Sequence, residues 1–191
     1  MSESKLNTSK VRAKKMMLLF ALLSITMTFA GLTSAYLVSK GRPDWLVDFQ
    51  LPNLFFYSTL IIVISSFTIQ ISHHYLKTNQ SKNKVIIWLV TTFLLGLVFC
   101  FLQFYSFKSL IEMGYFFAGA QSTITTSFIY VLTFVHGLHL LAGLIVLTVL
   151  IYNTLKNKYT YNMHGFELGL YFWHFLDILW VYLFLFFYFF G

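Results

Sequence analysis

The chain has 191 residues, of which 58% are hydrophobic, 20% aromatic and only 10% charged. This composition, with a mean hydropathy of +0.74, excludes an ordinary soluble globular domain. The formal net charge of +7 does not indicate a nucleic-acid-binding patch, because the basic residues lie between long apolar runs, as membrane topology requires.

Five apolar runs are long enough to cross a bilayer, which takes about 20 residues per helical span. They cover about residues 16–39, 54–72, 85–104, 126–152 and 168–190. We therefore expect an all-α integral membrane bundle of five transmembrane helices. A basic tail, residues 1–15, would precede one transmembrane domain, residues 16–191.

The basic residues predict the orientation of the bundle. Ten of the 13 lie in the N-terminal tail and in the second and fourth connections, and the other three (Lys40, Arg42 and Lys108) lie in the first and third. By the positive-inside rule the N-terminus is cytoplasmic. With five spans, the C-terminus then lies on the outer side of the membrane, which is the periplasmic side if the membrane is a bacterial inner membrane.

The fourth and fifth runs place ionisable side chains where hydrocarbon is expected, at His136, His139, His174 and Asp177. Such groups are costly in lipid and must face protein, water or a ligand. Each pair is spaced three residues apart, so its members share one side of a helix. Gly143 continues the face of His139 and would let the helix that carries Asp177 approach closely.

Four interpretations of this polar cluster remain open. Asp177 could accept a hydrogen bond from a histidine or tryptophan of a neighbouring helix and fix the register of the pair. The histidines and the carboxylate could bind zinc or iron, or one histidine from each helix could ligate a haem. The cluster could also belong to a proton or ion path, although the first three runs offer almost no ionisable partners.

Other polar and aromatic residues of the last third have more ordinary interpretations. Glu167 suits the start of a helix, and together with His164, Lys156 and Lys158 it could hold a lipid head group at the cytoplasmic surface. Trp173 and Trp180 are seven residues apart, and we expect them to pack inside the bundle.

These same segments carry a family resemblance. Phe134-Val-His-Gly-Leu-His-Leu-Leu-Ala-Gly143, then His164-Gly-Phe-Glu167 and Tyr171-Phe-Trp-His-Phe-Leu-Asp-Ile-Leu-Trp180, resemble subunit III of the haem-copper terminal oxidases in order, spacing and distance from the C-terminus. A weaker likeness extends through Phe29–Tyr36 and Gln103. Five spans resemble the short bacterial form of this family.

The resemblance implies a non-catalytic subunit of a proton-translocating oxidase that reduces oxygen to water with electrons from cytochrome c or a quinol. Its partners would be subunits I and II, which hold the haem and copper, together with membrane phospholipids and, in a supercomplex, a quinol-oxidising complex. This chain would hold no cofactor of its own except bound phospholipid. Its lipid cleft and interhelical polar network would comprise His136, His139, His164, Glu167, Trp173, His174 and Asp177.

Two departures from the family pattern bear on proton handling. Ile25 and Ser106 stand where many members of the family carry carboxylates, which favours a packing and lipid-holding role. The alternative from another class is a stand-alone membrane metalloenzyme or b-type cytochrome that uses the intramembrane histidines.

Overall fold

A computed structural model describes residues 3–43, 45–46, 49, 51–78, 81–119, 122–160 and 163–191, without the side chains of residues 3–8 and 160. Within these residues all the regular secondary structure is helical, and there is no β-strand. Its five long helices, in order, are α1 (Glu3–Val38), α2 (Asn53–Lys77), α3 (Lys82–Glu112), α4 (Ile124–Leu155) and α5 (His164–Phe190). Short 3-10 turns, η1 (Ser39–Gly41) and η2 (Lys158–Thr160), lie after α1 and before α5. The expected five-helix all-α bundle is confirmed.

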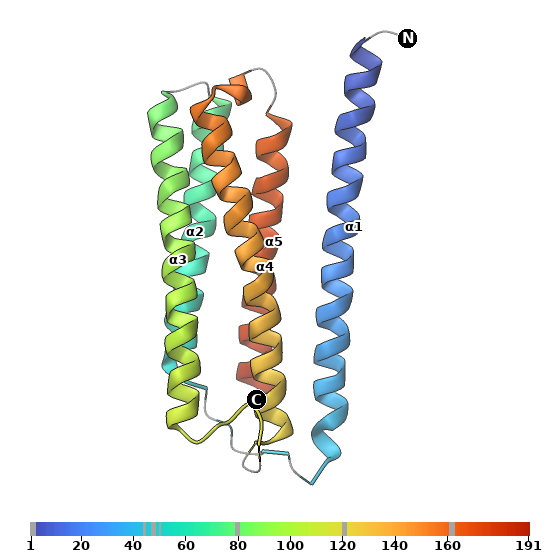
Figure 1. Cartoon of the computed structure of the whole chain (residues 1–191), viewed down its shortest axis with the longest axis vertical. Coiled ribbons are helices and arrows are strands. Elements are labelled where there is room, and N and C mark those ends of the chain that lie inside the picture. Colours follow the sequence, from blue (N-terminus) through green and yellow to red (C-terminus); the bar gives the residue numbers. More distant parts are fainter. Residues whose placement is uncertain are drawn as a thin grey trace.

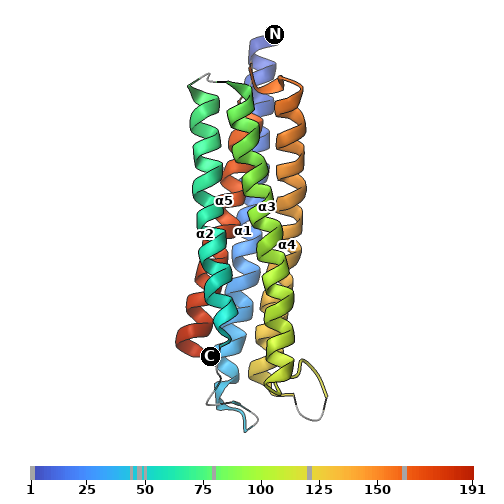
Figure 2. The same cartoon turned by 90° about the vertical axis from the view of Figure 1, so that its left-hand side faces the viewer.

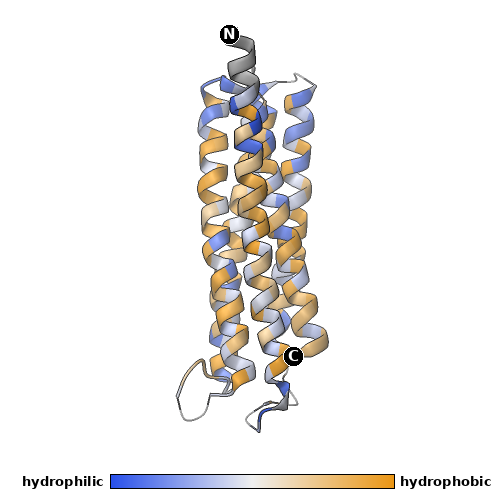
Figure 3. Ribbon diagram, turned by 90° about the vertical axis from the view of Figure 1, so that its right-hand side faces the viewer, coloured by the Kyte–Doolittle hydropathy of each residue, from blue (hydrophilic) through white to orange (hydrophobic). Residues whose placement is uncertain are grey.

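The five helices alternate in direction, and the two termini lie at opposite ends of the bundle (Figure 1 and Figure 2). α2 packs against α3 and α5, and α4 packs against the same two helices. Each helix carries an apolar stretch long enough to span a bilayer within the described residues. Figure 3 shows the apolar residues along the helices and polar residues at the end of the bundle where α1 begins.

The helices extend beyond most of the expected apolar spans. α1 already begins at Glu3 and contains most of the basic tail, whereas Ser39, the expected last residue of the first span, begins the η1 turn. Hydropathy locates the part of a helix that lies in hydrocarbon, whereas charged residues in water can continue the same backbone hydrogen bonds. With 36 residues, α1 is about 54 Å long, whereas the hydrocarbon core of a bilayer is about 30 Å thick.

Only one half of α1 is attached to the rest of the bundle. In the described stretch 9–28 no residue is buried, whereas Phe29, Thr33 and Tyr36 are buried against α4 and α5. The Thr33 and Tyr182 hydroxyls are 3.0 Å apart, and the Tyr36 hydroxyl donates a hydrogen bond to the Phe190 carbonyl. α1 therefore stands beside the other four helices and is anchored to them near its C-terminal end (Figure 1).

Candidate functional site

Buried and half-buried hydroxyl groups on α2 form the centre of the interhelical polar network. We call Ser58, Thr59, Ser65, Ser66, Thr68 and Ser72 the hydroxyl seam. Most of them donate to a carbonyl one turn earlier in α2 and can therefore accept from a neighbouring helix. Because each hydroxyl that bonds in this way gives its proton to a carbonyl of its own helix, its donor is not left unpaired in the membrane. The hydroxyl oxygens can still accept hydrogen bonds from α3 and α5.

Both buried tryptophans of α5 are anchored to this seam. The Trp173 indole donates to the Ser65 hydroxyl at 3.1 Å, and the Trp180 indole donates to the Thr59 hydroxyl at 3.0 Å. Both side chains are at most 1% exposed. The expectation that they pack inside the bundle rather than at the lipid interface is confirmed, and their hydrogen bonds fix the register of α5 on α2.

His174 also binds α2. Its Nε2 lies 3.2 Å from the Gln70 Oε1, which only accepts, so Nε2 carries the proton. The neutral ring then accepts at Nδ1 from the Ser66 hydroxyl, 2.6 Å away. His174 is therefore a bridge between α5 and two residues of α2.

Asp177 lies one turn further along α5, beside the same Ser66 hydroxyl, and is 3% exposed. The Ser66 hydroxyl has a single proton, which in the neutral form of the His174 ring goes to Nδ1 and not to Asp177. Neither carboxyl oxygen of Asp177 has a hydrogen-bond partner among the described residues. The contact that the sequence suggested, a histidine or tryptophan of another helix donating to Asp177, is thus not found in this part of the chain.

His136 and His139 contact aromatic rings of other helices. Both rings meet Phe29, with centroids 6.3 Å and 5.8 Å away. His139 donates from Nδ1 to the Val135 carbonyl of its own helix at 2.8 Å, whereas His136 is enclosed by aromatic rings, including Trp180 at 5.1 Å. The two histidines do share one face, as expected, but their ring contacts are aromatic and not with Asp177.

Gly143 has the predicted position between α4 and α5. A Cβ atom on this glycine would lie 2.7 Å from Leu176 Cδ1 and 3.3 Å from the Trp173 ring. The close approach of the two helices therefore requires glycine here.

Among the described residues no group of three or more His, Cys, Asp or Glu side chains is arranged to hold a metal ion.

A basic pocket lies at the other end of the bundle, where the N-terminal turns of α1 pass the start of α5. This cavity of about 270 Å³ is lined by Lys10 and Lys14 of α1, by Lys158 and Tyr159 of η2, and by His164. Asn153 donates to the Tyr159 hydroxyl at 3.3 Å. Burial raises the pKa of Tyr159, and this hydrogen bond opposes part of the shift, so at neutral pH the hydroxyl is uncharged and can donate.

Glu167 lies in the first turn of α5, where the helix dipole favours a carboxylate. Its Oε2 is 3.5 Å from His164 Nδ1. The three lysines leave the pocket with a positive balance, which suits a phosphate group. His164 and Lys158 were singled out in the sequence, but the lysines of α1 and the hydroxyl seam were not.

The spacing of the seam is a signal that the sequence does contain. Ser58, Ser65 and Ser72 recur every seven residues, as do Thr59 and Ser66, which places each set on one face of a helix. A run of hydroxyls with this period inside an apolar span predicts a face that packs against other helices.

Comparison with known proteins relates this architecture to one family. The family model described as Cytochrome c oxidase subunit III matches residues 7–191. The cytochrome bo(3) ubiquinol oxidase subunit 3 of Buchnera aphidicola subsp. Baizongia pistaciae is 38% identical over 181 residues, covering 89% of this chain and 88% of that protein. The cytochrome c oxidase subunit 3 of Bacillus sp. (strain PS3) is 33% identical over 164 residues, covering 83% and 77%.

Proposed function

Because the chain belongs to the cytochrome c oxidase subunit III family, we propose that its own part in the oxidase is structural, holding lipids and stabilising subunit I. The chain is a subunit of a haem-copper oxidase, the enzyme complex that reduces oxygen in aerobic respiration, and is a multi-pass protein of the bacterial inner membrane. We propose that subunits I and II hold the haem and copper, and that this chain performs no catalytic step.

Two features support the lipid-holding role: the exposed apolar half of α1 and the basic pocket at its end. The half of α1 that precedes Phe29 exposes apolar side chains such as Met17 and Phe20, and none of its residues from 9 onward is buried. At the end of this half, Lys10, Lys14 and Lys158 line one cavity. Acyl chains between α1 and the bundle, with a phosphate in the basic pocket, would satisfy both features.

The polar network supports the structural role of the remaining helices. Trp173, Trp180 and His174 join α5 to α2 through neutral hydrogen bonds, and His139 bonds to its own helix. Such contacts position helices within a membrane, which supports a structural role. A relative named for ubiquinol and one named for cytochrome c both match this chain. We therefore propose that the electron donor, whether cytochrome c or a quinol, binds partner subunits. The structural role of this chain would then be the same with either donor.

The proposed topology places the basic pocket in the cytoplasm. The helix ends and connections at this end of the bundle carry ten of the 13 basic residues of the sequence. This bias supports a cytoplasmic N-terminus and a periplasmic C-terminus. The pocket would then face the leaflet surface from which an anionic head group can enter.

Purification through a tag on the N-terminus tests membership in the complex. We expect large partner subunits with high-spin haem and copper to accompany the chain out of gently solubilised membranes. A lone chain of 22.3 kDa with stoichiometric iron or zinc would instead support the stand-alone metalloenzyme or b-type cytochrome.

Replacement of Lys10, Lys14 and Lys158 together by glutamine tests the lipid-holding role. We expect native mass spectrometry of the purified complex to show fewer bound anionic phospholipids, with the subunits still associated. The matched control replaces Lys40, Arg42 and Lys108, the three basic residues of the other end, by glutamine. Equal lipid retention in the wild type and in both variants would contradict the role of the basic pocket.

A further inference from the structure

A line of polar side chains reaches the outer surface of the bundle in the groove between α2 and α5. Ser66 and His174 are half-buried there, and Gln70 is exposed. The three are joined by the hydrogen bonds described above, between Ser66 and His174 and between His174 and Gln70. We call these three residues the α2–α5 polar stripe.

The stripe lies within the membrane-spanning part of both helices. Gln70 is seven residues, or about 10 Å of helix, before Lys77, where α2 ends. His174 is ten residues, or about 15 Å, after His164, where α5 begins. Because the headgroup layer on each side of a bilayer is only about 5–8 Å thick, both side chains lie at the depth of the hydrocarbon.

The Gln70 amide brings hydrogen-bond donors without a partner to this depth. Its Oε1 accepts from His174, whereas its Nε2 makes no hydrogen bond within the part of the chain that the structure describes. Lipid tails supply no acceptor, and a polar group that stays unpaired in hydrocarbon is costly. The amide of this exposed residue therefore requires an acceptor from outside the chain.

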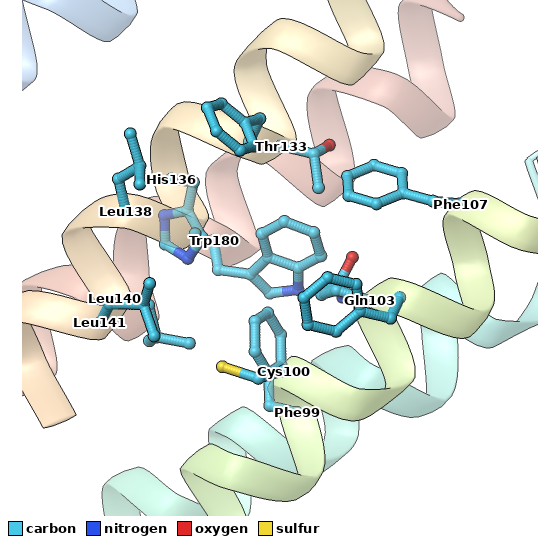
Figure 4. A pocket seen from close by; sticks show the side chains of 13 residues that line it. Phe99, Cys100, Gln103, Phe107, Thr133, His136, Leu138, Leu140, Leu141 and Trp180 are labelled. Carbon is cyan, nitrogen blue, oxygen red and sulfur yellow. The ribbon is translucent and has the colours of Figure 1, made fainter. Parts of the chain in front are cut away.

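The outer faces of α3 and α4 differ from this groove. At the same depth they expose apolar side chains such as Leu94 and Ile145, and the exposed Thr148 donates its hydroxyl proton to a carbonyl of its own helix. A pocket of about 130 Å³ between the two helices also has almost entirely apolar walls, including Phe99 and Leu140 (Figure 4). Lipid tails can cover this side of the bundle without any polar partner.

Large side chains border the polar stripe on the outside. Phe67 of α2, together with Tyr171 and Ile178 of α5, is more than half exposed. Each of them is three or four residues from Gln70 or His174 on the same helix, so it lies on the same side of that helix. In a membrane a second helix packs its side chains between such ridges and forms hydrogen bonds with the polar groups that it meets.

We propose that the groove between α2 and α5 binds a transmembrane helix of a partner subunit, and that this helix supplies a side-chain acceptor to the Gln70 amide. Suitable acceptors are the side-chain oxygens of serine, threonine, asparagine or glutamine, because the backbone carbonyls of a transmembrane helix are already bonded within it. The proposal rests on the structural role in the oxidase proposed above, and it names the surface through which the chain performs that role.

Photo-cross-linking in the intact complex identifies what covers the groove. p-Benzoylphenylalanine is encoded at Phe67 or Tyr171 beside the stripe and, as matched controls, at Phe101 of α3 or Phe134 of α4, all of them 56–66% exposed. After illumination of native membranes the complex is purified, and the cross-linked peptides are sequenced by mass spectrometry. We expect the positions of Phe67 and Tyr171 to label one transmembrane segment of the same partner subunit, and the control positions not to label that segment.

Gln70→Met tests the hydrogen bond itself. Methionine has a similar length and offers His174 a weak sulfur acceptor, but it has no N–H group. We expect the variant chain to dissociate from the purified complex about fivefold more readily in a detergent titration, the typical effect of one lost hydrogen bond. Thr148→Val is the control, because it removes an exposed polar group outside the groove and should leave dissociation unchanged. Hydrogen–deuterium exchange in α2 and α5 of each variant complex verifies that these helices remain folded.

A cryo-EM map of the wild-type complex should show a helix in the groove with a side-chain oxygen about 3 Å from the Gln70 Nε2. Cross-links from the positions of Phe67 and Tyr171 to lipid alone, or to a second copy of this chain, would overturn the proposal. Unchanged dissociation of Gln70→Met would also overturn it. A wild-type chain that purifies without any haem-bearing partner would instead contradict the proposed function, and this inference with it.

Discussion

At the scale of single residues, hydrogen bonds between the indoles of α5 and the hydroxyl seam of α2 should be measurable contributions to stability. Trp173→Phe removes the donor to Ser65, and Ser65→Ala removes the acceptor. A double-mutant cycle, read as the free energy of unfolding in mixed micelles, should give a coupling of about 0.6–2 kcal/mol. The control cycle combines Trp173→Phe with Thr59→Ala, since Thr59 binds Trp180 instead, and should be additive within about 0.5 kcal/mol.

Asp177 should behave differently from these anchors. Its carboxyl group is buried and has neither a hydrogen-bond donor nor a salt bridge to a cation among the described residues. Asp177→Asn keeps the shape and removes the ionisable carboxyl group, so the free energy of unfolding of the subunit should stay within about 0.5 kcal/mol or rise. Chemical unfolding of the subunit alone and within the complex measures this. A clear loss in the complex alone would mean that a partner subunit supplies a group that binds the carboxylate.

At the scale of the helices, Gly143 determines how closely α4 and α5 approach. In Gly143→Ala the new methyl group would meet Leu176 and Trp173, and Trp173 is held in place by Ser65. We expect a loss of about 1–3 kcal/mol in the free energy of unfolding, because the side chains must leave their packed positions. Gly137→Ala is the control on the same helix, where the methyl group meets no atom within 4 Å, and it should be neutral or slightly stabilising.

A stability of Gly143→Ala equal to that of Gly137→Ala would contradict the argument from close approach. Thermal unfolding of the two variants in the same detergent makes the comparison direct. The two glycines lie six residues apart on α4, so differences in local helix propensity largely cancel.

The sequence predicts the helices better than their contacts. Hydropathy is a property of each segment alone, and for that reason the number of helices and their apolar centres could be predicted. Which faces meet depends on the arrangement of all five helices. The face of Gly143 does meet α5 as predicted. Asp177, for which one interpretation was a histidine or tryptophan donor on a neighbouring helix, lies instead beside Ser66 of α2.

The missed residues share a physical reason. Serine and threonine are common within apolar spans because they bond to their own helix, and so a single hydroxyl carries little information. Ser65 and Thr59 become important only because indoles from α5 reach them. Lys10 and Lys14 were read as topology signals, and their approach to Lys158 depends on α1 continuing as a helix beyond its apolar span.

At the scale of the whole molecule, α1 is packed against the other helices only near its C-terminal end. The position of its N-terminal end therefore depends on which molecules fill the space beside it. Phe29, Thr33 and Tyr36 hold the C-terminal half of α1, and no residue of the stretch 9–28 is buried. A helix with so few packed side chains along half of its length is free to move unless lipid or another subunit contacts it. Lipid in this space would therefore set the position of the basic end of α1.

Removal of phospholipid from the complex should then affect the two ends of α1 differently. Spin labels on encoded keto amino acids at Met17 and Val149, both at least 50% exposed, report the distance between α1 and α4 in the half of the bundle where α1 begins. Phospholipase treatment should broaden this distance distribution in pulsed EPR. Labels at Val38 and Phe189, both at least 70% exposed near the anchored end, should keep a narrow distribution, because the contacts of Tyr36 with α5 do not involve lipid. If both distributions stay narrow, a partner subunit rather than lipid holds the free half of α1, and the structural role of the chain would rest on protein contacts alone.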